Sequence, residues 1–91
     1  MAQKLYLGRA SVYLEADPFR GRPESVTEYS ADYLVVDKSE DLATNKFLAH
    51  LRAKGRHRNW KKDKMQELLA GSDTPLEKRL EILGEHFELI D

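Results

Sequence analysis

Residues 25–36, SVTEYSADYLVV, alternate between two kinds of side chain, and this alternation constrains the fold more than any other feature of the chain. One face is continuous and carries Thr27, Tyr29, Ala31, Tyr33 and Val35. The other face is polar in its middle, as expected of an antiparallel strand with one solvated face. The segment therefore predicts a strand that buries its first face and pairs with a neighbouring strand.

Residues 4–14, KLYLGRASVYL, predict that neighbouring strand, because they are rich in β-branched and aromatic residues. Leu5 and Leu7 share one face, whereas Ala10, Val12 and Leu14 share a face one residue out of phase. A bulge at Gly8–Arg9 would bring both sets to one face, because one extra residue shifts the side-chain register. A tight hairpin at the same dipeptide is the alternative.

Residues 15–24, EADPFRGRPE, predict the loop between the two strands, because Asp17-Pro18, Gly21 and Pro23 are turn residues. Loops of this length sometimes carry function. We expect a wide hairpin connection in which Phe19 is tucked against the sheet.

A helix is predicted from Asp37 to Gly55. Asp37 and Glu40 have the spacing of a capping box, and Ser39 is a competing cap. The stripe expected to face the sheet consists of Leu42, Thr44, Phe47, Leu48 and Leu51. Gly55 supplies the C-terminal stop.

A second helix is predicted over residues 60–70, after an Asn59 cap and before Gly71. Its buried side would consist of Met65, Leu68 and Leu69. These three residues have the spacing of one helical face.

A third helix is predicted over residues 75–90, with Thr74 as its N-cap and Pro75 at its first position. Its stripe consists of Leu76, Leu80, Leu83, Phe87 and Ile90. The alternative is a helix that ends at Gly84, which would free His86–Ile90 to form a further strand. The stripe could also form a dimer seam, although we expect it to pack on its own sheet.

Together these elements predict one α+β domain over residues 1–91. Its two layers would be an N-terminal antiparallel β-hairpin and three helices on one face, with a short third strand at the C-terminus as the alternative. The sequence leaves the oligomeric state open and favours a monomer.

The composition excludes several function classes. The chain has no Cys, which removes disulfides, thiolate metal sites and a cysteine nucleophile. His50, His57 and His86 have no metal-ligand spacing, and no nucleophile–base motif is visible, so we expect neither a metal, a cofactor nor an enzyme. Without a signal peptide or an apolar run of membrane-spanning length, the chain is predicted to be cytoplasmic, without a membrane partner.

The charge distribution is strongly segregated along the chain. Residues 46–64 carry eight Lys or Arg against one acid, whereas the rest of the chain carries seven Lys or Arg against fifteen Asp or Glu. With two helices on either side of Gly55, the basic segment predicts a helix–loop–helix junction that binds an anionic partner. The candidate contact residues are Arg52, Lys54, Arg56, His57, Arg58, Trp60, Lys61, Lys62 and Lys64.

Two functions follow from this pattern. In the first, the cations hold phosphates of a nucleic acid or nucleoprotein complex, and Trp60 stacks on a base. In the second, the basic face docks on an acidic protein surface. In size, absence of Cys and segregated charge, the chain is similar in general style to small phage-encoded inhibitors of host defence complexes, such as anti-CRISPR proteins. That resemblance implies an inhibitor whose target is a protein assembly.

Overall fold

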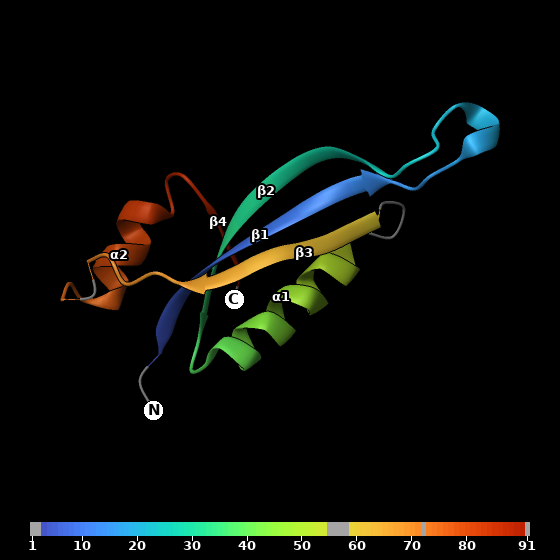
Figure 1. Ribbon diagram of the computed structural model, residues 1–91. Helices are drawn as coiled ribbons and strands as arrows, with labels where there is room; N and C mark the ends of the chain where they lie inside the picture. The colour runs from blue at the N-terminus through green and yellow to red at the C-terminus, as the bar shows by residue number, and fades with distance from the viewer. Residues whose placement is uncertain (1–2, 55–58, 72, 91) are drawn as a thin grey trace.

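The computed structural model describes residues 3–54, 59–71 and 73–90 as an α+β domain, which confirms the predicted class (Figure 1). Its elements, in chain order, are β1 (Lys4–Leu14), the 3₁₀ helix η1 (Pro18–Arg20), β2 (Val26–Asp37), α1 (Glu40–Lys54), β3 (Asn59–Glu67), α2 (Leu76–Leu83) and β4 (Glu88–Ile90).

The four strands form one mixed sheet in the order β3-β1-β2-β4. The predicted hairpin of β1 and β2 is its centre, and β3 pairs antiparallel with the outer side of β1. Strand β4 pairs parallel with β2, with Leu34 opposite Leu89. Because a two-stranded ribbon is marginally stable alone, the added strands complete the sheet on which α1 packs.

Helix α1 covers one face of this sheet and forms the core with it (Figure 1). The buried cluster consists of Tyr6, Ala10, Tyr33, Val35, Ala43, Phe47, Leu51, Met65 and Ile90. Phe47 is the largest fully buried side chain. Gly8 makes room for it, because a Cβ at that position would lie 3.1 Å from Phe47 Cζ.

The prediction of three helices after the hairpin is wrong. The structure has two α-helices among the described residues, and residues 59–67 form strand β3 instead of a helix over 60–70. Arg9 lies opposite Lys64 while Ala10 lies opposite Lys62, so Asp63 is an extra, bulged residue. In a regular strand, residues an odd number of positions apart lie on opposite faces. The bulge brings Trp60 and Met65 to the same face although they are five positions apart, so the sequence shows no period-2 pattern.

The third predicted helix is half the expected length, and the alternative of a C-terminal strand is confirmed. Helix α2 ends at Leu83, and the N–H of Gly84 donates to the Leu80 carbonyl. Strand β4 follows after one turn and buries Ile90 in the core. The helix begins one residue later than predicted, with Pro75 as its N-cap and no capping side chain.

The bulge predicted in the first strand is also absent. Tyr6, Ala10 and Val12 of β1 keep one alternation throughout, and the extra residues lie on the partners, at Glu28 of β2 and Asp63 of β3. Leu5 is buried on the opposite face from Val12. Both halves of the strand are thus buried, but on different faces.

The helix predicted after Asp37 is confirmed, with two adjustments. It begins at Glu40, and the N–H of Leu42 donates to Ser39 Oγ at 3.3 Å, so Ser39 is the cap. Asp37 instead accepts a hydrogen bond from the Lys38 N–H. Leu42 is 47% exposed, so it does not belong to the stripe that faces the sheet.

The hairpin of β1 and β2 extends past α1 and β3 as an arm, defined here as residues 14–26 (Figure 1). The arm makes the molecule long, with extents of 53 × 22 × 19 Å. Phe19 at its tip is completely exposed, so the expectation that it tucks against the sheet is wrong.

Candidate partner-binding surface on strand β3

The basic segment is divided between the C-terminal half of α1 and the edge strand β3, so it is not a helix–loop–helix junction. β3 pairs only with β1 among the described residues, which leaves its second side open. Lys61, Lys62 and Lys64 project from this strand, are all exposed, and form no ion pair within the described part of the chain. We call these three residues the lysine edge.

The lysine edge is distributed over both faces of the sheet, and the bulge at Asp63 places Lys64 on the same side as Lys61. Lys62 lies opposite Ala10, on the side of α1, whereas Lys61 and Lys64 lie on the other side. Lys61 Nζ lies 5.7 Å from the centroid of the Tyr13 ring. The lysine edge can therefore approach an anionic partner from the open side of the strand.

Two other cations of the basic segment are engaged within the fold. Lys54 Nζ donates to Tyr33 Oη at 3.1 Å and to Glu88 Oε2 at 3.2 Å, which joins the end of α1 to β2 and β4. The Tyr33 hydroxyl, followed by Glu88, raises the pKa of Lys54. Lys46 Nζ donates to the Val36 carbonyl at 2.7 Å. Of the predicted contact residues on α1, only Arg52 is exposed and without a described partner.

Trp60 serves mainly as a packing residue. Its ring is partly buried against the core cluster and meets the Tyr29 ring edge-on at a centroid distance of 5.8 Å. Its indole N–H is buried, with no hydrogen-bond partner in the described structure. Lys54 Nζ lies 5.9 Å from the indole centroid. Little of the ring is therefore left for a stacked base.

The sheet face beside Lys64, on the side away from α1, carries paired charges. Arg9 Nε donates to Asp32 Oδ1 at 2.8 Å, and its Nη2 donates to Oδ2 at 3.3 Å. This bidentate contact lowers the pKa of Asp32. The Ser11 hydroxyl donates to the carboxylate of Asp63. This face is thus of mixed charge, and three of the four charged residues at positions 61–64 of the strand edge are lysines.

Three of the predicted contact residues, Arg56, His57 and Arg58, lie outside the described residues. Among the residues that are described, no three His, Asp or Glu side chains gather as a metal site. Likewise, neither of the helices described has the length and apolarity needed to cross a membrane.

Sequence reasoning predicted a loop at residues 15–24 but not the ordered turn that exposes Phe19 at the tip of the arm. Its turn is closed by hydrogen bonds from Arg22 N to the Asp17 carbonyl at 2.8 Å and from Arg20 N to the same carbonyl at 3.0 Å. Gly21 adopts a φ of 83°, which a residue with a Cβ rarely does. The Pro and Gly residues of PFRGRP predicted the turn. They did not reveal whether Phe19 would be buried or exposed.

No family model, curated protein or solved structure matches this chain.

Proposed function

We propose that this chain is a non-enzymatic binding protein that contacts the phosphate backbone of a nucleic acid through the lysine edge and Arg52. The observation that carries the proposal is the absence of any described acidic partner for these four cations. Lys46 and Lys54 of the same segment have hydrogen-bond partners within the fold, although Lys54 is exposed, so it is the lack of a described partner that distinguishes the cations available for binding.

The geometry favours contact with the backbone over sequence reading. From Lys61 to Lys64 the strand spans roughly 10 Å, enough for the three ammonium groups to reach several phosphates. Trp60 is packed inside, and no described helix presents a basic face to a groove, since α2 exposes Glu77, Glu81 and Lys78. Such contacts give affinity without base specificity.

Lysines on an open strand edge also oppose pairing with a strand of another chain, and that role needs no ligand. The two roles differ in a measurable way. If the lysine edge only blocks aggregation, it should bind polyanions no more tightly than three exposed lysines elsewhere on the protein do.

The experiment compares three proteins by fluorescence anisotropy with labelled single- and double-stranded DNA and RNA at low salt. The test variant carries Lys61→Ala, Lys62→Ala and Lys64→Ala. The control carries Lys4→Ala, Lys38→Ala and Lys78→Ala, which removes the same charge from exposed positions elsewhere. We expect at least a tenfold loss of affinity in the test variant alone. Equal binding by both variants, or no binding by the wild type, would refute the proposal.

An acidic protein surface is the second candidate. It is favoured by the packing of Trp60, which leaves little of the ring to stack on a base, and by the mixed charge around Arg9 and Asp32, which suits a partner surface of complementary charge. Poly-L-glutamate serves as the probe in the same titration. Binding of this polypeptide without binding of nucleic acid, lost in the test variant, would select the second candidate. The inhibitor role suggested by the general style of the sequence would then be the next prediction to test.

A further inference from the structure

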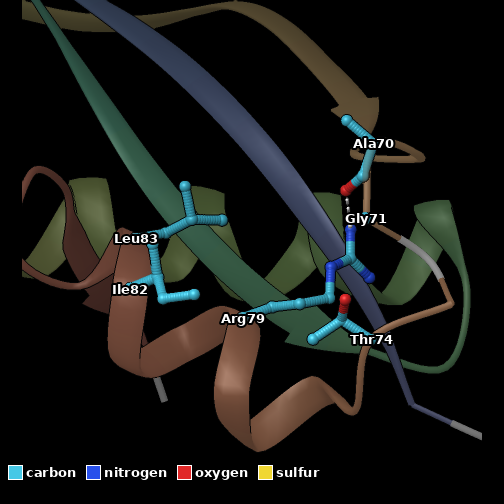
Figure 2. Close-up of a pocket in the computed structure, with 6 residues that line it drawn as sticks. All are labelled: Ala70, Gly71, Thr74, Arg79, Ile82 and Leu83. Carbon is cyan, nitrogen blue, oxygen red and sulfur yellow. Dashed lines mark hydrogen bonds between the residues drawn. The ribbon is translucent and has the colours of Figure 1, made fainter.

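A small pocket lies between helix α2 and the chain that follows strand β3. It is lined by Ala70, Gly71, Thr74, Arg79, Ile82 and Leu83 (Figure 2). The side chains of Ala70, Ile82 and Leu83 are apolar, and Arg79 is the one charged residue among the six. The pocket therefore combines apolar walls with a single cation.

The guanidinium group of Arg79 is only partly engaged by the fold. Its Nη2 donates to the carbonyls of Leu68 and Ala70, the latter at 3.1 Å. These two hydrogen bonds attach α2 to the preceding chain, but they use one nitrogen of a group that has five N–H donors. The N–H of Nε, which is buried, and those of Nη1 have no hydrogen-bond partner in the described structure. Donors beyond those needed for packing are thus left at the pocket.

No carboxylate balances the charge of Arg79 within the described part of the chain. Arg79 takes part in none of the ion pairs found there. Asp73 and Glu81, which are adjacent in sequence to lining residues, are exposed and do not line the pocket. A half-buried cation that contacts only neutral carbonyls favours an anionic ligand, because hydrogen bonds between ionised groups are about twice as strong as those between neutral groups.

Two further lining residues suit an anion beside Arg79. The hydroxyl of Thr74 points toward the guanidinium group and has no hydrogen-bond partner among the described residues, so it can donate to the same anion (Figure 2). Gly71 leaves space beside the guanidinium group, since a Cβ at this position would lie 3.9 Å from Arg79 Nε. Gly71 also adopts a φ of 75°, which residues with a Cβ rarely do.

The volume of the pocket, about 180 Å³, limits the size of the ligand. Small-molecule sites usually occupy about 300–1,000 Å³, so this pocket is small for a nucleotide or a cofactor. An apolar cavity of about 150 Å³ is sufficient for benzene, so a ligand of about six or seven non-hydrogen atoms fits. Phosphate or sulfate would leave the apolar walls uncovered, and an alcohol would leave the cation without a counter-charge. A carboxylate with a short alkyl chain satisfies both parts of the pocket.

We propose that this pocket binds a small aliphatic monocarboxylate of the size of butyrate or valerate. The carboxylate accepts hydrogen bonds from Arg79 and Thr74, and the alkyl chain contacts Ile82 and Leu83. The site uses neither the lysine edge nor Arg52, so it is independent of the proposed binding of nucleic acid.

The first test is a nuclear magnetic resonance titration that follows the Nε–H signal of Arg79 in the wild type. The ligands are valerate, acetate, octanoate and valeramide. We expect valerate to bind at least fivefold more tightly than acetate, which lacks the longer chain, and than valeramide, which lacks the charge. The absence of a saturable shift with valerate would overturn the proposal, as would an affinity that keeps rising through octanoate. Tighter binding of N-acetyl-leucine, which imitates a peptide C-terminus, would overturn the assignment to a free acid.

The second test compares three variants in the same valerate titration, followed by backbone amide signals. Arg79→Gln should weaken binding at least tenfold and Thr74→Val about threefold, because a charged and a neutral hydrogen bond are removed. Lys78→Gln is the control, since it removes the same charge from an exposed position of α2 outside the pocket, and it should change the affinity less than twofold. Because Arg79→Gln also removes the hydrogen bonds to the carbonyls of Leu68 and Ala70, Thr74→Val decides the outcome if α2 is displaced. Wild-type affinity in Thr74→Val, or equal losses in Arg79→Gln and Lys78→Gln, would refute the site.

Discussion

Two phenylalanines differ completely in burial: Phe47, between α1 and the sheet, and Phe19, at the tip of the arm. Phe47 is completely buried between α1 and the sheet, with its ring 5.7 Å from that of Tyr33. Phe19 is completely exposed, although it lies in the connection between the two central strands. The first residue contributes to folding, and the second is free to contact another molecule.

The same contrast continues along each strand. Val12 of β1 is 1% exposed, whereas Leu14, two residues further, is 36% exposed. On β2, Val35 is completely buried and Val26 is 50% exposed. Burial of the β1 and β2 side chains ends where α1 and β3 end. An apolar residue of these strands therefore stabilises the fold only where α1 or a neighbouring strand covers it.

The largest difference is expected between Phe47→Ala and Phe19→Ala. Removal of the buried ring should lower the free energy of unfolding by about 3–5 kcal/mol, because it leaves a cavity in the core. Removal of the exposed ring should change it by less than about 0.5 kcal/mol. Urea denaturation followed by circular dichroism measures both. Comparable losses from the two variants would mean that the arm packs on the body in solution.

A smaller effect is expected from Gly8→Ala, which tests how tightly the covered face is packed. The new Cβ would lie 3.1 Å from Met65 Cε and 3.1 Å from Phe47 Cζ. We expect a loss of about 1–3 kcal/mol from overpacking. Thr27→Ala on the exposed part of β2 is the control, with a change within about 0.5 kcal/mol. A neutral Gly8→Ala variant would contradict the close packing of Phe47.

The smallest effect concerns Arg9 and Asp32 on the sheet face away from α1. Arg9 lowers the pKa of Asp32, so the folded state resists protonation more than the unfolded state. The resulting stabilisation is fully present above the ordinary carboxyl pKa of about 4 and is lost as the pH falls through the lower, folded-state pKa. Because both side chains are partly exposed, we expect a contribution of at most about 1 kcal/mol.

Chemical denaturation of Arg9→Ala between pH 7 and pH 2 tests this contribution. The variant should be less stable than the wild type at pH 7 and should approach it at pH 2. Arg52→Ala, which removes a cation without a described partner, should not alter the pH dependence. An Arg9→Ala curve parallel to that of the wild type would show that the pair is fully screened by solvent.

The sequence was informative where one period held over most of an element. The alternation of residues 25–36 and the helical spacing around Phe47 predicted β2 and α1. The predicted buried face of β2 is wrong at its start, because the bulge at Glu28 moves Thr27 to the other face and both Thr27 and Tyr29 are exposed. In β3, the bulge at Asp63 removed the alternation, and Met65, Leu68 and Leu69 imitated a helical face. The spacing of residues within this segment could not reveal that it would pair, as a strand, with the free side of β1.

The candidate site was predictable in composition but not in geometry. The charge count located the basic segment, yet it could not show that Lys54 is engaged by Tyr33 and Glu88 while Lys62 is free. Nor could it show that Trp60 packs against Tyr29. Those distinctions depend on long-range contacts that bring β2 and β4 to the end of α1.

The salt dependence of binding tests the central proposal most directly. Four free cations, the lysine edge and Arg52, predict that log K for duplex DNA falls with log salt concentration at a slope of about −3 to −4. Replacement of all three lysines by alanine should reduce the magnitude of that slope by about 3. A wild-type slope near zero, or one that the three substitutions leave unchanged, would show that the lysine edge does not hold phosphates.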